Sequence, residues 1–318
     1  MRHRILLISL AVCACALAGA LPAQASFPGA NGQLLYDHHY AQPPNSIGTT
    51  DFNRPFTDEW WCCYISTGPV VDARNPAWSP DGTQIAFDAP ATELGSRRAL
   101  YVMNADETGL RQVGRGDRLR YNPAWSPDGG KLAFVQDNGQ GSGSGDIYTI
   151  TTGGANLKRL TTSGAWDGSP DWSGDNRRIA YVCRSGGRSQ VCQMTPTGTS
   201  KTVTTAKLAL PGNVIAPSWS PTSADLAFSV IGANGGYDRV YRMSRSGGSL
   251  RELTPQLDYG PIGPAVWSPD GQRIAYDLCN AGECEITTVS AVDGTDAVRV
   301  IGNDSEFELD PGGWQPLR

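Results

Sequence analysis

The sequence is poor in the residues from which most metal centres are built. It contains three histidines among 318 residues, and two of them, His38 and His39, are adjacent. A zinc centre needs three or four ligands that converge from separate parts of a chain. We therefore expect no metal ion and no other cofactor, with one alternative left open: calcium bound by carboxylate and carbonyl oxygens in a channel.

An excess of positive charge is also missing. The 26 Lys and Arg residues are outnumbered by 31 Asp and Glu residues, so the formal net charge is −5, and no basic cluster interrupts the sequence. Proteins that bind nucleic acid carry a basic surface that neutralises phosphates. This charge balance argues against nucleic acid as a partner.

Beyond the first 25 residues there is no apolar run long enough to span a bilayer. Those 25 residues combine Arg2 and Arg4 with the uncharged stretch Ile5 to Leu21 and the small-residue motif Ala23-Gln24-Ala25. This pattern predicts a signal peptide over residues 1–25, with a retained membrane anchor as the alternative. We expect residues 26–318 to form one secreted or extracytoplasmic domain, with no transmembrane segment after cleavage.

Cleavage would leave six cysteines, an even number that suggests disulfides in an exported chain. Cys183 and Cys192 occupy the second and third strands of one expected hairpin, and Cys279 and Cys284 occupy the matching places of a later one. We expect each pair to lie opposite across its hairpin and to form a disulfide. The redox state of the adjacent Cys62 and Cys63 stays open.

A repeat organises the rest of the chain. The pentapeptide Trp-Ser-Pro-Asp-Gly begins at Trp78, Trp125 and Trp267, and looser copies begin at Trp172 and Trp219. With Trp314, the tryptophans are spaced by 47, 47, 47, 48 and 47 residues. A fixed period of this length is typical of propellers and other repeat folds.

Each repeat predicts four short β-strands, because alternating β-branched and aromatic residues are separated by turn residues. A single such sheet cannot bury both faces, and radial stacking solves this problem. We therefore predict an all-β, six-bladed β-propeller of four-stranded antiparallel blades. The first unit lacks an inner strand and the last Trp lacks a following one, so we expect residues Asp310–Pro316 to pair with the N-terminal strand and close the ring.

The repeat Trp-Ser-Pro-Asp-Gly-x-x-Ile-Ala-Phe, followed by Tyr101-Val-Met-Asn-Ala-Asp106, resembles the TolB-like β-propeller family, also described as WD40-like or PD40. The opening Phe27-Pro-Gly-Ala-Asn-Gly32 and the ending Asp310-Pro-Gly-Gly-Trp-Gln-Pro316 resemble the ends of its exported members. The resemblance covers roughly residues 27 to 318 and implies an exported member without the N-terminal domain of TolB. Some relatives are pectate-degrading lyases with a His-rich metal site, for which this chain has too few histidines.

The most conspicuous repeated residues have structural interpretations. We expect the repeated Trp to pack between neighbouring blades, because it occupies the same place in each unit. We expect Asp81, Asp128 and Asp270 to accept hydrogen bonds within their own turns. Neither set is predicted to bind a ligand.

Function in a propeller concentrates where loops converge at the mouth of the central channel. Here this channel-mouth rim consists of the residues just before each inner strand. Its candidate ligand-binding residues are Arg74, Asn75, Tyr121, Asn122, Trp166, Asp167, Asn213, Tyr259, Glu308 and Asp310.

No catalytic residue can be assigned, because no acid–base pair, nucleophile or Gly-x-Ser-x-Gly motif is visible. The mixed aromatic, Arg and Asn composition of the rim favours a monomeric scaffold that binds a protein or peptide. The alternative is a carbohydrate-binding or carbohydrate-active lyase or hydrolase, with Asp167, Glu308 or Asp310 as acids and Trp166 stacked on a sugar. Whether the chain is an enzyme stays undecided, and binding is favoured over catalysis.

Overall fold

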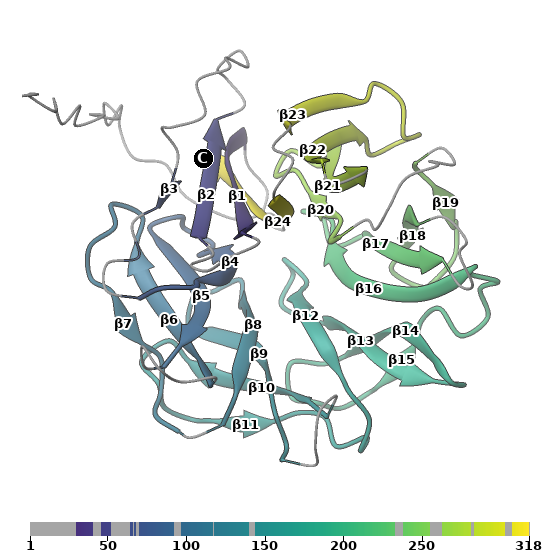
Figure 1. Cartoon of the computed structure of the whole chain (residues 1–318). Coiled ribbons are helices and arrows are strands. Elements are labelled where there is room, and N and C mark those ends of the chain that lie inside the picture. Colours follow the sequence, from purple (N-terminus) through teal and green to yellow (C-terminus); the bar gives the residue numbers. More distant parts are fainter. Residues whose placement is uncertain are drawn as a thin grey trace, which may run out of the picture.

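The computed structural model describes residues 30–40, 46–51, 64–65, 67, 70–91, 97–116, 118–139, 144–232, 238–254, 263–280, 283–302 and 307–317. Within these ranges all 24 regular elements are β-strands, arranged in four-stranded antiparallel sheets. The sheets surround a common centre (Figure 1), so the all-β propeller class is confirmed. In this part of the chain there is no helix with the length and apolar character of a membrane span.

Five of the sheets are built from four consecutive strands, with the first strand innermost and the fourth outermost. We call these sheets blades and name each by its strands. The strands are β4 (Arg74–Trp78), β5 (Gln84–Pro90), β6 (Arg98–Asn104) and β7 (Arg111–Gln112); β8 (Arg120–Trp125), β9 (Lys131–Gln136), β10 (Asp146–Thr151) and β11 (Lys158–Arg159); β12 (Gly168–Trp172), β13 (Ile179–Ser185), β14 (Arg188–Met194) and β15 (Thr202–Val203); β16 (Gly212–Trp219), β17 (Asp225–Gly232), β18 (Arg239–Ser244) and β19 (Arg251–Glu252); and β20 (Val266–Trp267), β21 (Arg273–Asn280), β22 (Glu283–Ser290) and β23 (Val298–Gly302).

The remaining sheet joins the two ends of the chain, in the order β24-β1-β2-β3. We call it the closing sheet. In its register Asp310 is the partner of Asp37, and Pro316 is the partner of Asn31. Its strands are β1 (Ala30–Tyr40), β2 (Ser46–Asp51), β3 (Tyr64–Ile65) and β24 (Phe307–Leu317).

The prediction of six blades is corrected to five. A blade has its Trp at the end of the inner strand and a tight turn leading directly to the second strand, and five sheets satisfy this description. The closing sheet is built differently, because its inner strand β24 comes from the opposite end of the sequence and no turn connects it to β1. The prediction counted Trp residues and second-strand patterns, and it therefore included the two half-units at the ends of the chain as one further blade.

The repeated Trp residues form part of the hydrophobic core. Indole side chains at all five blade positions are at most 2% exposed, which confirms the packing interpretation. Nε1 of Trp125 donates to the carbonyl oxygen of Ala77 at 3.0 Å, so this indole reaches the inner strand of the preceding blade. Within the blades, aromatic residues of the second and third strands stack, for example Phe87 on Tyr101 with ring centroids 5.7 Å apart.

The turn after each inner strand is fixed by its own Ser and Asp. Oγ of Ser126 donates to Asp128 at 2.6 Å, and the N–H of Gly130 donates to the same carboxylate at 2.9 Å. The bond from Ser126 is the main reason why the pKa of Asp128 lies below its ordinary value. The turn interpretation of Asp81, Asp128 and Asp270 is therefore confirmed, since Ser79 and Ser268 bond Asp81 and Asp270 in the same way.

The alternation of strand direction divides the loops between two faces. The turns between first and second strands share one face with the turns between third and fourth strands. The other face carries the hairpins between second and third strands and the loops that enter each inner strand. The channel-mouth rim belongs to this second face.

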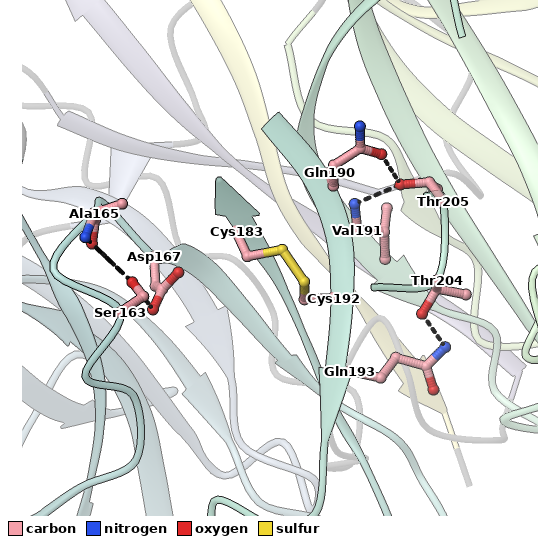
Figure 2. Close-up of a disulfide and its surroundings, with 10 residues drawn as sticks. All are labelled: Ser163, Ala165, Asp167, Cys183, Gln190, Val191, Cys192, Gln193, Thr204 and Thr205. Atoms are coloured by element: carbon pink, nitrogen blue, oxygen red, sulfur yellow. Dashed lines mark hydrogen bonds between the residues drawn. A yellow bond between two sulfur atoms is a disulfide. The ribbon is translucent and has the colours of Figure 1, made fainter. Parts of the chain in front are cut away.

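Cys183 and Cys192 form a disulfide across the β13–β14 hairpin, as predicted, with their Cα atoms 5.8 Å apart (Figure 2). They are not directly opposite, because Cys183 is the register partner of Gln190 and Cys192 is the partner of Tyr181. Cys279 and Cys284 are direct register partners in the β21–β22 hairpin. Their side chains, and residues Cys62 and Cys63, lie outside the described part of the chain, so these pairings stay predictions.

Candidate functional site

Four inner strands, β4, β8, β12 and β16, share a bulge in their pairing with the second strand, next to the channel-mouth rim. In β4 the register shifts between Arg74 and Ala77, and in β8 it shifts between Tyr121 and Ala124. Each bulge holds a residue with positive φ followed by proline, which has no N–H to offer to a ladder. These residues are Asn75 (φ 51°), Asn122 (φ 52°), Ser169 (φ 46°) and Ala216 (φ 39°).

Two of these bulged residues converge on one buried carboxylate. Asp88 is fully buried in β5, and its Oδ1 accepts from Nδ2 of Asn75 at 2.8 Å and from the backbone N–H of Asn122 at 3.1 Å. Nδ2 of Asn122 also donates to Oδ1 of Asn75 at 2.9 Å. The β4–β7 and β8–β11 blades are thereby joined by a polar contact beside the channel.

Arg98 extends this network outward. Its Nε pairs with Oδ2 of Asp88, and its Nη1 lies 2.6 Å from Oδ2 of Asp72. Asp72 in turn pairs with Arg74, whose side chain is 39% exposed. Burial raises the pKa of Asp88, whereas the Arg98 guanidinium opposes that shift. The chain of alternating charges ends at Arg74, the member that faces solvent.

An aromatic pair lies one blade further along the rim. Nε1 of Trp166 donates to the hydroxyl oxygen of Tyr121 at 3.0 Å, and both residues are half-buried. Two glycines make room for them. A Cβ atom would lie 2.0 Å from the Trp166 ring at Gly168, and at Gly145 it would lie 3.2 Å from that ring and 3.4 Å from the Tyr121 hydroxyl. The pair is therefore held against backbone rather than projecting freely.

Asp167 follows this pair directly and is 1% exposed. Its Oδ2 accepts from Oγ of Ser163 at 2.9 Å (Figure 2), whereas no described residue hydrogen-bonds its buried Oδ1. Burial raises the pKa of this carboxyl. A carboxyl group with a raised pKa stays protonated at pH values where an ordinary Asp is ionised, so it keeps a proton that it can donate.

The structure thus separates the predicted rim residues into groups. Arg74, Asn75 and Asn122 belong to the Asp88 network, and Tyr121, Trp166 and Asp167 form the aromatic site. Asn213 is exposed on β16, where its Oδ1 accepts from the N–H of Ser189 in the neighbouring hairpin at 2.9 Å.

The other three predicted rim residues cannot be placed in these groups. Tyr259 lies outside the described residues. Glu308 and Asp310 lie in β24, where their register partners are His39 and Asp37, and their side chains are not described.

Sequence reasoning missed Asp88, the residue on which the first group converges. A signal was present, since Asp88 occupies the position directly after the aromatic residue of the second strand. The equivalent residues of the later blades are Val135, Val182, Ser229 and Asp277. Asp277 is also buried and accepts from the N–H of Gly263 in the segment that leads into β20, so in two blades a carboxylate at this position bonds the chain at or just before an inner strand.

Among the side chains that the structure describes, no three His, Cys, Asp or Glu residues gather closely enough to hold a metal ion. The described chemistry of the rim is instead aromatic surface, amide groups, one partly exposed guanidinium and two buried acids, Asp88 and Asp167. Such groups suit recognition of a mixed polar and apolar partner.

The sequence model of the TolB beta propeller domain matches residues 71–209 and 169–311. No curated protein gives a match. TolB from Acinetobacter baumannii has a TM-score of 0.70 at 20% identity, covering 90% of this chain and 67% of its own. A TolB candidate from Agrobacterium tumefaciens has a TM-score of 0.63 at 16% identity, covering 89% of this chain and 99% of its own. An oligogalacturonate lyase in complex with manganese has a TM-score of 0.60 at 14% identity, covering 89% of this chain and 78% of its own. At these identities the solved structures establish a common fold.

Proposed function

Because this chain belongs to the TolB β-propeller family, we propose that it is an exported binding scaffold whose channel-mouth rim recognises a protein or peptide. Residues 1–25 act as the signal peptide in this proposal, and residues 26–318 form the mature domain. The Cys183–Cys192 disulfide supports an extracytoplasmic location, because such bonds persist in oxidising compartments.

The observation that carries the proposal is the Tyr121–Trp166 pair. These half-buried aromatic residues come from two different blades, and their hydrogen bond fixes them side by side at the channel mouth. Tyr and Trp are enriched among the residues that dominate the energy of protein interfaces. Their orientation is set before binding, so little side-chain entropy is lost when a partner docks.

The polar groups around the pair fit the same role. Asn75 and Asn122 bond each other and the buried Asp88, so the two half-buried asparagines present a fixed polar surface. Arg74 remains partly exposed at its edge. An aromatic centre with a polar surround is the usual composition of a protein interface.

The test begins with capture of a partner by the secreted chain and continues with purified components. We expect Trp166→Ala to weaken binding by about thirtyfold or more, which corresponds to about 2 kcal/mol for a dominant interface residue. Isothermal titration calorimetry measures the change. Gly168→Ala should weaken binding as well, because its Cβ would displace the Trp166 ring.

Matched controls separate recognition from damage to the fold. Val292→Ala trims an apolar side chain that is 63% exposed on the opposite face, and Gly153→Ala adds a methyl group where no atom lies within 4 Å. Both should bind as the wild type does. Equal affinity of the wild type and Trp166→Ala for the captured partner would refute the rim as the binding surface.

One observation favours a carbohydrate ligand as the second candidate. Asp167 is a buried acid with a raised pKa directly beside Trp166, and a general acid next to a sugar-stacking ring is a glycosidase arrangement. A glycan array and a reducing-sugar assay test it. Glycan binding or bond cleavage that Asp167→Asn abolishes would support this alternative, and silence in both assays would remove it.

A further inference from the structure

A groove of about 660 Å³ opens between the β12–β15 and β16–β19 blades. Its walls come from the start of β13, the outer strand β15 with the loop that follows, and the β18–β19 turn, so it lies away from the channel-mouth rim. These two blades are neighbours in the ring (Figure 1). The residues that matter below are Arg178, Thr202, Thr204, Lys207, Arg245 and Ser246.

The groove is cationic although the whole chain is acidic. Arg178, Lys207 and Arg245 line it, and no Asp or Glu does. One carboxylate approaches from outside, because Oδ2 of Asp175 lies 2.6 Å from Nη1 of Arg245. Arg178 and Lys207 therefore have no ion-pair partner in the part of the chain that the structure describes, whereas the formal net charge of the chain is −5.

Arg178 carries the strongest signal. Its Nη1 is buried and has no hydrogen-bond partner among the described residues. A buried donor without an acceptor costs free energy, and the cost is larger for a charged group. An unsatisfied buried donor in a native structure therefore calls for an explanation, and a bound molecule that supplies the acceptor is one.

An arginine of a later blade provides a comparison for Arg178. Arg273 occupies the same position at the start of β21 that Arg178 occupies before β13. Its guanidinium donates to Oγ1 of Thr288 at 2.9 Å, to the carbonyl oxygen of Thr288 at 2.9 Å and to that of Asp296. In the β12–β15 blade the position of Thr288 is taken by Gln193, whose register partner is Ala180, and Nη1 of Arg178 forms no hydrogen bond with it. Nε2 of Gln193 donates to Oγ1 of Thr204 at 3.0 Å (Figure 2) and to the carbonyl oxygen of Arg245 at 2.7 Å.

Those same contacts hold the groove in shape. The guanidinium of Arg245 lies 5.3 Å from the ring centroid of Trp219 and is anchored by Asp175 of the preceding blade. Gln193 ties the β14 strand to the β18–β19 turn. Arg245 is therefore positioned by both blades before any ligand arrives, and Thr202, Thr204 and Ser246 add hydroxyl-bearing side chains to the same walls.

We propose that this groove binds an oxyanion group, a phosphate, sulfate or carboxylate, with Arg178 as its principal contact and Lys207 as a second charge. A guanidinium presents a planar fork of donors that matches the oxygens of such groups. The site is separate from the channel-mouth rim, so a ligand can occupy it without contacting Trp166 or Tyr121.

Titration of the purified full-length chain with inorganic phosphate, sulfate and acetate at constant ionic strength tests the proposal. We expect saturable binding of at least one anion to the wild type, with the dissociation constant raised at least tenfold by Arg178→Gln. Lys207→Gln changes an exposed side chain and should raise it by a smaller factor. Tight binding of phosphate and sulfate would indicate a doubly charged group, and tight binding of acetate would indicate a carboxylate.

Arg111→Gln is the matched control, because Arg111 is an exposed arginine that bridges two other blades through the carbonyl oxygen of Thr152. It should bind the anions as the wild type does, and near-UV circular dichroism verifies that each variant is folded. The proposal is overturned if no anion binds saturably to the wild type, or if Arg178→Gln and Lys207→Gln both bind as well as Arg111→Gln. None of these variants should alter recognition at the rim, so failure here leaves that proposal untouched.

Discussion

At the residue scale, the surroundings of Asp167 favour its neutral form. Burial places its pKa in the folded state above the value of an unfolded chain. Between these two pKa values the folded state binds more protons than the unfolded state does. Stability contributed by this carboxyl is therefore full below the unfolded pKa and is lost as the pH rises through the folded pKa.

Asp167→Asn should remove this loss, because the amide cannot ionise. We expect the variant to match the wild type in acid and to become the more stable protein as the pH rises toward neutrality. Urea unfolding at a series of pH values measures the difference. Asp293→Asn, at a fully exposed residue whose pKa is lowered by bonds from Thr295, should show no such gain. Parallel stability curves for the wild type and Asp167→Asn would contradict the prediction.

The sequence was informative about residues that repeat and less so about residues that do not. A Trp at one place in every unit has to serve a need common to all units, so packing could be inferred before any coordinates. The contacts of Trp166 could not be inferred, because they involve the hydroxyl group of Tyr121, 45 residues away in another blade, and the backbone of Gly168, which has no side chain. Contacts that occur between only one pair of blades do not repeat along the sequence, so no periodic pattern reveals them.

At the scale of the element, the β13–β14 hairpin combines a tight turn with a covalent link. Gly186 and Gly187 both have positive φ, as a two-residue hairpin turn of the favoured hand requires. Replacing both Cys183 and Cys192 by Ser should lower the free energy of unfolding by about 2–3 kcal/mol, because the unfolded chain regains the entropy of a loop of about ten residues.

Urea unfolding with and without a reductant measures the effect of this bond. The reduced wild type should unfold at the same urea concentration as the double Ser variant, and the variant itself should not respond to the reductant. An unchanged midpoint for the double variant would show that the hairpin is held by its ladder alone.

The hairpin also shows what spacing can and cannot predict. The expectation that the two cysteines lie close together is correct, whereas their direct opposition is not, because the two-residue turn sets a register with Gln190 facing Cys183. Turn geometry decides register, and a Gly-Gly pair followed by Arg leaves more than one turn open.

At the scale of the whole molecule, pairing of β24 with β1 holds the two chain ends in one sheet. Deleting residues 309–318 would remove most of β24 and leave the edge of β1 without a partner. We expect a product that aggregates or loses its cooperative thermal transition, since an open edge invites pairing between molecules. Removal of Arg318 alone, which leaves β24 complete, is the control.

Differential scanning calorimetry and light scattering measure both properties. A soluble truncated chain with a sharp transition at the wild-type temperature would show that the ring does not depend on this pairing. The architecture of the ring could be predicted because the repeat fixes it. The number of blades could not be predicted, because both ends of the sequence carry part of a unit and only the folded structure shows how these parts combine.

The same pairing has a consequence for the order in which the protein is made. β1 is the first strand to emerge from the ribosome and β24 is the last. The inner edge of β1 therefore has no partner until nearly the entire chain has been synthesised. A contact between such distant residues forms slowly. A permuted chain that fuses the present ends and starts instead between two blades would keep every contact of the fold, yet it would be expected to reach that fold sooner.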